Sequence, residues 1–253
     1  MGRAHEVRAA SMAKTAAAKS AKNAKHAKAM YVACKKGGSA NPEANLEFKA
    51  AILRAKKDKV PNSVIENVIK KFEGGTGEEY TSYRYEGYGP AGTAVIVDCL
   101  SDNVNRTVAA VKNCFTKTGG NLGVNGSVSY LFDSVSIISV EKASIGETDL
   151  FELLLDNDID ISDVYDAKDS SGEDKDEEVD VVTVIGKPSD YNTIKSIISD
   201  NCPEVVYTTD ELSMLPQNEV TLDDEALRKF ERFYNFLDEL EDVQRIYHNV
   251  KNF

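Results

Sequence analysis

The sequence contains no tryptophan, three histidines and four cysteines. The cysteines are widely separated and form no CxxC pair, which indicates reduced thiols in an intracellular protein. The histidines show no metal-ligand spacing, so we expect no metal site. No apolar run approaches the length of a membrane span, and the basic amino terminus lacks the apolar segment of a secretory signal. These absences exclude disulfide-rich, membrane-spanning and secreted classes of protein.

Common catalytic and phosphate-binding motifs are also missing, because the chain has no GxxxxGK[ST], GxSxG or HExxH. "GYGPAG" (87–92) has the glycine spacing of a dinucleotide fingerprint, but it contains Pro90 and precedes a predicted strand instead of a helix. A strand-to-strand turn explains it better. Asp98 and Asp102 could form an acid–base pair, although solvation at a strand end is the simpler interpretation. We therefore expect no cofactor, no small-molecule substrate and no enzymatic activity, with an unrecognised carboxylate site as the remote alternative.

Positive charge is concentrated at the front of an acidic chain. The formal net charge is −12, yet residues 1–71 hold 16 Lys and Arg against 5 Asp and Glu, and the remainder holds 14 against 37. Such asymmetry is typical of a polyanion-binding end on an acidic body. Alanine and lysine favour a helix over 12–37, where lysines recur every third residue from Lys19 to Lys28 and sweep about half the circumference. A mitochondrial presequence is the alternative explanation for this segment.

Ammonium groups on one helical surface can hold a phosphate backbone by displacing its counterions, without reading bases. His26 and Tyr31 could stack on exposed bases, which would favour RNA. Arg106, in "DNVNRT" (102–107), is either a second phosphate contact or part of a helix cap. The predicted nucleic-acid-binding residues are Lys14, Lys19, Lys22, Lys25, His26, Lys28, Lys35, Lys36 and Arg106.

Hydrophobic periodicity predicts an α+β protein with three domains. After helices over 46–57 and 61–73, the pattern changes to strands, including 93–100 and 126–132. The later elements run βαββαβ, which is the ferredoxin-like split motif. A terminal helix capped by Thr221 and a last strand complete the middle domain. The predicted domains are 1–75, basic and all-helical; 80–133 plus 217–253, a discontinuous ferredoxin-like α+β domain; and 134–214, an inserted ferredoxin-like α+β domain.

An acidic stretch, "DAKDSSGEDKDEEVD" (166–180), is predicted to form a hairpin tip between two strands of the inserted domain. It is either a solvated loop or an acidic arm that mimics nucleic acid.

Several long segments resemble the YebC/PmpR family. They include "RYEGYGPAGTAVIVDCLSDNVNRT" (84–107), "KTGGNLGVNGSVSYLF" (117–132) and "LDELEDVQRIYHN" (237–249), and the resemblance extends over nearly the whole chain. "KGGSANPEAN" is similar to the YeeI-like branch. The family usually begins with Ser, Lys and a Trp after Met-Gly, whereas this chain begins "MGRAHEVRAASMAK". A family contact in that first segment therefore cannot be assigned to residues 3–13.

The resemblance implies a cytoplasmic, non-enzymatic protein of three domains. Members of the family are described as probable transcriptional regulators that bind DNA, as a mitochondrial translational activator, or as ribosome-linked factors that help elongation through proline-rich nascent segments. We expect a nucleic-acid-binding regulator of gene expression, with ribosomal RNA as its target. A DNA-binding transcriptional regulator is the alternative.

Overall fold

The computed structural model describes residues 3–75, 77, 79–169 and 178–253, with side chains from residue 19 onward. The fold is α+β, as predicted, with helices packed around two four-stranded antiparallel sheets. The chain divides into two compact units, one formed by 1–131 together with 218–253 and the other by 132–217. The further division of the first unit into a helical domain and a discontinuous α+β domain stays a prediction.

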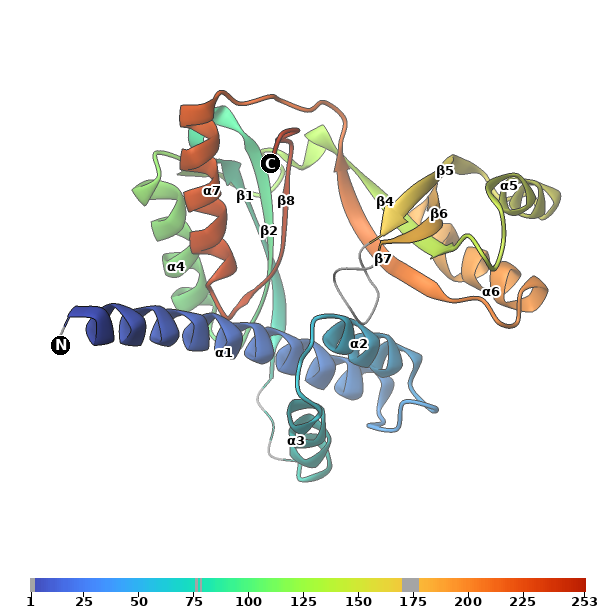
Figure 1. Cartoon of the computed structure of the whole chain (residues 1–253), viewed down its shortest axis with the longest axis horizontal. Helices are drawn as coiled ribbons and strands as arrows, with labels where there is room; N and C mark the ends of the chain where they lie inside the picture. The colour runs from blue at the N-terminus through green and yellow to red at the C-terminus, as the bar shows by residue number, and fades with distance from the viewer. Residues whose placement is uncertain (1–2, 76, 78, 170–177) are drawn as a thin grey trace. The chain divides into compact units, whose positions relative to one another are not determined.

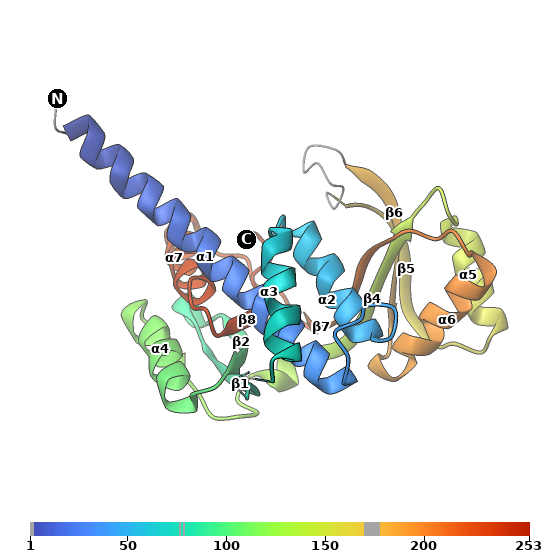
Figure 2. The same ribbon diagram turned by 90° about the horizontal axis from the view of Figure 1, so that it is seen from below.

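The first unit begins with α1 (Arg3–Gly37), α2 (Leu46–Lys57) and α3 (Asn62–Glu73). Helix α1 starts before residue 12, since the residues after Arg3 include several alanines, which favour helix. Figure 2 shows α2 and α3 beside the carboxyl-terminal half of α1, while the amino-terminal half extends beyond them. Asn45 joins α1 to α2, because its Oδ1 accepts the N–H of Phe48 at 3.0 Å and its Nδ2 donates to the Ala33 carbonyl at 2.9 Å.

The sheet of the first unit has the strand order β3-β1-β2-β8. Helices α4 and α7 lie side by side against one face of it (Figure 1). Their buried side chains, Phe115 from α4 and Phe230 and Phe233 from α7, pack on Val95 and Val97 of β2. The elements of this part are β1 (Thr81–Tyr88), η1 (Pro90–Gly92), β2 (Ala94–Ser101), α4 (Val104–Lys117), β3 (Asn121–Leu122), η2 (Ser129–Leu131), α7 (Asp224–Asp238) and β8 (Val243–His248).

The "GYGPAG" segment forms the predicted strand-to-strand turn, joining the antiparallel strands β1 and β2. Ala91 and Gly92 have φ values of 58° and 75°, so the turn uses the left-handed region.

Two local predictions are wrong. Residues 126–132 do not form a strand, because the buried carboxylate of Glu86 accepts the N–H groups of Gly126, Val128 and Ser129 at 2.9–3.0 Å. Backbone donors bound to a side chain cannot join a ladder, so the next strand begins only at Phe132. The cap of α7 is Asp223, whose Oδ1 accepts the N–H of Ala226, and not Thr221.

The second unit has the strand order β5-β6-β4-β7 with all neighbours antiparallel. Its first and third strands are central, as in the ferredoxin-like motif. Leu150 and Leu154 of α5 and Ile194 and Ile198 of α6 pack on the central strands. The elements are β4 (Phe132–Glu141), α5 (Glu147–Asp156), β5 (Ile161–Asp169), β6 (Val179–Gly186), η3 (Pro188–Asp190), α6 (Tyr191–Asn201) and β7 (Tyr207–Pro216).

The acidic stretch 166–180 connects β5 to β6. Its residues 170–177 lie outside the described residues, so both interpretations of it stay predictions. Within the described part of the chain, every helix is too short or too polar to cross a membrane.

Candidate nucleic-acid interface

Helix α1 is anchored mainly through its carboxyl-terminal half. Met30, Tyr31 and Cys34 are buried in a core that also contains Phe48 and Val68. The preceding turns carry mostly alanine and lysine, which offer little apolar surface. Since a helix of this kind gains little stability from packing, other contacts must hold it. The lysines supply such contacts and at the same time define the candidate interface.

Two of the predicted lysines point back into the protein. Lys28 Nζ lies 2.5 Å from Asp242 Oδ1, and Lys25 Nζ lies 2.7 Å from Asp238 Oδ1. Lys25 also donates to the main-chain carbonyl of Asp238. Both lysine side chains are nearly buried, at 14% exposure for Lys25 and 13% for Lys28. Their charges are therefore neutralised internally, by the last residue of α7 and by the turn between α7 and β8.

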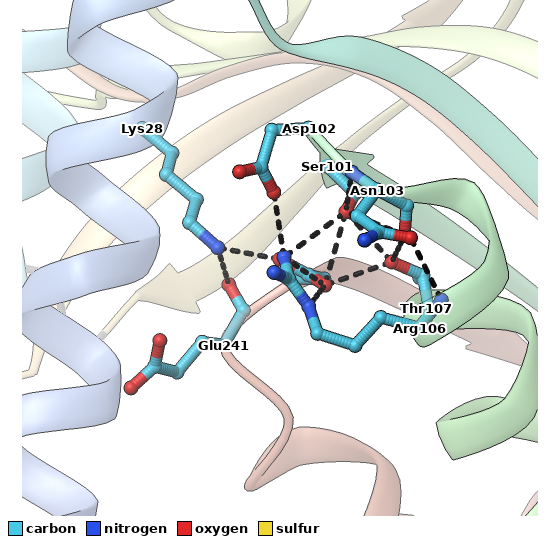
Figure 3. A network of polar contacts seen from close by, with 8 residues as sticks. Lys28, Ser101, Asp102, Asn103, Arg106, Thr107 and Glu241 are labelled. Carbon is cyan, nitrogen blue, oxygen red and sulfur yellow. Dashed lines mark hydrogen bonds and ion pairs between the residues drawn. The ribbon is translucent and has the colours of Figure 1, made fainter. Parts of the chain in front are cut away.

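Asp242 is the centre of a network that joins α1, α4 and this turn. Figure 3 shows Lys28 of α1 and Arg106 and Thr107 of α4 in this network. Besides Lys28, its carboxylate accepts hydrogen bonds from Arg106 Nη2 at 3.1 Å, Thr107 Oγ1 at 2.8 Å and Ser101 Oγ at 3.1 Å. Burial opposes ionisation, but the hydrogen bonds from Lys28, Thr107 and Arg106 hold the pKa of Asp242 below its ordinary value. The aspartate is therefore charged at neutral pH and fully satisfied.

An open cavity of about 490 Å³ lies beside this network. Lys28 and Arg106 line it together with the carboxylates of Asp102, Glu241 and Asp242. Because charges of both signs share its wall, a phosphate group would gain little there. The cavity is not a natural anion site.

Arg106 has a mainly internal role in this geometry. Its Nη2 lies 2.7 Å from Asp102 Oδ1 and also contacts Asp242, although its side chain is 54% exposed. The cap of α4 is supplied by Asn103, whose side chain accepts the N–H of Arg106. Asp98 is paired with Arg84 at 2.7 Å, so each carboxylate of the imagined acid–base pair has its own arginine.

His26 and Lys22 both contact Asp58, next to the end of α2. His26 Nε2 lies 2.7 Å and Lys22 Nζ 3.2 Å from the carboxylate. The hydrogen bond from His26, opposed by burial and assisted by Lys22, lowers the pKa of Asp58 to about 2. The imidazole is thus occupied by an internal partner, which does not leave it free to stack on a base.

Tyr31 does not have the stacking role considered from the sequence. Its side chain is 3% exposed, and its ring meets the rings of Phe72 and Tyr80 edge-on at 6.5 and 6.2 Å. The position lies on the buried side of α1, which its helical spacing from Cys34 could have indicated.

Three predicted lysines face outward. Lys19 and Lys35 are exposed, and the Lys35 ammonium lies 5.6 Å from the centroid of the Tyr31 ring. Lys36 is 71% exposed and pairs with Glu47 at 2.6 Å. The side chain of Lys14 lies outside the described residues. Further exposed cations were missed in the site prediction although they belong to the same basic region; they are Lys49, Arg54, Lys56, Lys57, Lys59 and Lys70.

The comparisons with protein families cover nearly all of the chain. A family model of the TACO1/YebC amino-terminal domain matches residues 3–75, and a model of the TACO1/YebC second and third domain matches residues 80–250.

Relatives of similar length exist in marine bacteria and vibrios. A protein of Alteromonas mediterranea is 41% identical over 250 residues, covering 99% of this chain and 98% of its own. One of Vibrio parahaemolyticus is 41% identical over 253 residues, covering 99% and 100%. Both are named probable transcriptional regulatory proteins. The crystal structure of a conserved hypothetical protein from Aquifex aeolicus is similar, with a TM-score of 0.68 and 33% identity over 90% of this chain and 88% of that one.

Proposed function

Because the chain belongs to the TACO1/YebC family, we propose that it is a non-enzymatic, nucleic-acid-binding regulator of gene expression. The observation that carries this proposal is the outward cationic surface of the basic helical region, on a chain that is otherwise acidic. Lys19, Lys35 and Lys36 are accessible on α1. Such lysines bind a phosphate backbone by releasing its counterions, so the binding would be sensitive to salt and indifferent to base sequence.

The remaining predicted contacts contribute less directly. Lys25, Lys28 and Arg106 already face carboxylates, so a phosphate would have to displace an existing partner. Lys25 and Lys28 support the interface by holding α1 against the end of α7 and the turn that follows it, and Arg106 ties α4 to the same turn. Lys22 and His26 similarly hold α1 to Asp58.

The preferred target is ribosomal RNA, with the protein acting in the cytoplasm as a translation factor that eases elongation through proline-rich nascent segments. The acidic remainder of the chain would repel a long, smooth duplex, whereas a folded RNA surface with crevices can accept a local basic helix. Lysine acts as a point charge and suits backbone contacts better than base readout.

A DNA-binding transcriptional regulator is the second candidate. It is favoured by the printed names of the Alteromonas and Vibrio relatives, which are probable transcriptional regulatory proteins. A DNA-binding regulator must protect a specific promoter fragment, whereas a ribosome-bound translation factor need not. Promoter protection therefore distinguishes the two candidates.

Sedimentation of cell lysate through sucrose gradients, at two salt concentrations and with or without nuclease, tests the target. Co-migration with ribosomes that is lost at high salt supports the ribosomal version. Absence from ribosomes together with protection of a defined promoter fragment supports the transcriptional version instead.

Charge reversal tests the surface. The variant Lys19→Glu/Lys35→Glu should lower affinity for RNA at least about tenfold and reduce the salt dependence of binding, since two phosphate contacts are lost. The matched control is Lys112→Glu/Lys117→Glu, which makes the same charge change at exposed positions of α4. Equal losses in both variants, or no loss in the first, would show that α1 does not hold the nucleic acid.

A further inference from the structure

Two helices expose more apolar surface than their packing explains. The large apolar side chains exposed on the described α-helices are Leu46 and Leu53 of α2, Val104 of α4, and Phe151 and Leu155 of α5. Within the described residues, α2 and α5 are therefore the helices that each expose two such side chains. A pair on one helix face forms a patch, whereas a single exposed residue is ordinary.

On α2 the exposed pair lies opposite the buried face. Leu46 and Leu53 are 80% and 59% exposed, and their spacing of two helical turns puts them on one side of the helix. The core side carries Phe48, Ala51 and Ala55, which are buried. An amphipathic helix needs one apolar stripe to pack on its domain. Helix α2 has a second one, and it points to solvent.

Cations flank this second stripe on both sides. At about 100° per residue, Lys49 and Lys56 fall on one side of the leucines and Arg54 on the other. All three side chains are exposed. Lys49 is paired with Glu43 at 3.1 Å, and Glu47, which lies beside Arg54, pairs with Lys36, so Arg54 and Lys56 are the cations that can face a docking partner. A phosphate backbone would bind the cations but would leave the leucines against polar groups. A partner helix with an apolar stripe and an acidic edge would match both the leucines and the cations of α2, as in other complexes where an amphipathic helix binds through its apolar face.

The chain itself contains a helix of that description. Phe151 and Leu155 of α5 are 45% and 58% exposed and lie one turn apart, while Leu150 and Leu154 are buried on the adjoining face of the helix. The exposed residues Glu152 and Asp156 follow next around the helix. Helix α5 thus presents an apolar pair with an acidic edge.

We propose that α2 of one copy of this chain docks against α5 of a second copy. The leucine stripe meets Phe151 and Leu155, and the cations on one side of that stripe face Glu152 and Asp156. Leu46 and Leu53 are about 10 Å apart along their helix and Phe151 and Leu155 about 6 Å, so the α5 pair fits within the length of the α2 stripe. Charge also favours this pairing of α2 with α5. Each copy has a net charge of −12, so two copies repel each other over most of their surfaces and attract where a basic surface meets an acidic one. This inference is independent of the proposed function.

Sedimentation velocity of the full chain at low salt, over a rising series of concentrations, measures the association. One helix pair buries less surface than a standard interface, so we expect a weak, reversible and concentration-dependent dimer or higher oligomer. A chain that sediments as a monomer at every concentration overturns the proposal.

Two charge reversals locate the contact. Arg54→Glu/Lys56→Glu and Glu152→Lys/Asp156→Lys should each weaken self-association about tenfold or more, because each puts like charges opposite one another. An equimolar mixture of the two variants should associate again, since every α2 then faces an α5 of opposite charge. The control Lys112→Glu/Lys117→Glu should associate like the wild type.

An apolar substitution completes the test. Leu53→Ser should weaken association, whereas Val124→Ser, at a loop position that is 78% exposed, should not. Association that survives the charge and leucine variants overturns the proposal. A monomeric wild type whose Arg54→Glu/Lys56→Glu variant loses affinity for RNA overturns it as well, and would assign α2 to nucleic acid instead.

Discussion

At the scale of single residues, Asp242 shows how one buried carboxylate can position a basic helix. It follows directly after α7 and its turn, and it is reached by Lys28 from α1 and by Arg106 and Thr107 from α4. Its side chain and that of Lys28 are 11% and 13% exposed. A charge pair that is this poorly hydrated costs much to break, because removal of one partner leaves the other uncompensated.

We therefore expect Asp242→Asn to lower the free energy of unfolding by about 3 kcal/mol. Urea denaturation followed by circular dichroism measures the change. The matched control is Asp238→Asn, where the side chain facing Lys25 is 61% exposed. Because water screens that pair, the control should lose no more than about 1 kcal/mol. Equal losses in the two variants would show that the Asp242 network does not hold the helix.

At the scale of elements, α1 is connected to its neighbours by polar contacts at defined points along its length. Nearest its carboxyl end it packs through Met30 and Cys34, and earlier it is held by ion pairs. The contact of His26 and Lys22 with Asp58 joins it to the end of α2. Ionic contacts of this kind depend on pH.

Acid should weaken the attachment of α1 to α2. The pKa of Asp58 is lowered from 3.8 to about 2, so its contribution to stability is complete above pH 3.8 and is lost as the pH falls toward 2. We expect the free energy of unfolding of the wild type to fall through this range more steeply than that of Asp58→Asn. Urea titrations at several pH values between 5 and 2 measure both slopes. Parallel curves would contradict the assigned role of Asp58.

At the scale of the whole molecule, residues 132–217 form a compact unit with a hydrophobic core of their own. The chain enters and leaves this unit through neighbouring strands, because Phe132 of β4 pairs with Pro216 of β7. An inserted unit whose ends are adjacent disturbs its host little.

We expect a fragment of residues 132–217 to fold by itself. Thermal melting followed by circular dichroism should show one cooperative transition, and its proton NMR spectrum should be well dispersed. Ile138→Asp, which puts a charge into the core of this unit, should abolish the transition. A wild-type fragment without a transition would mean that the unit depends on the rest of the chain.

Local signals in the sequence predicted most helices and strands, because hydrophobic period, caps and glycine stops act over a few residues. The failure at residues 126–132 had a cause that lies far away in the sequence. Residues 126–132 look like a strand, but Glu86, some 40 positions earlier, takes their backbone donors. Nothing in the sequence of residues 126–132 indicates that a distant buried carboxylate accepts three of their backbone N–H groups.

The sequence by itself determined that this protein is α+β, that the first 71 residues are the part with a net positive charge, and that those residues are mostly helical. Only the tertiary structure decided which lysines are accessible. Lys25 and Lys28 have the same spacing and composition around them as Lys19, yet their carboxylate partners lie more than 200 positions away in the chain. Ion pairing depends on distance in space, and helical periodicity contains no information about what a distant turn brings to a helix face.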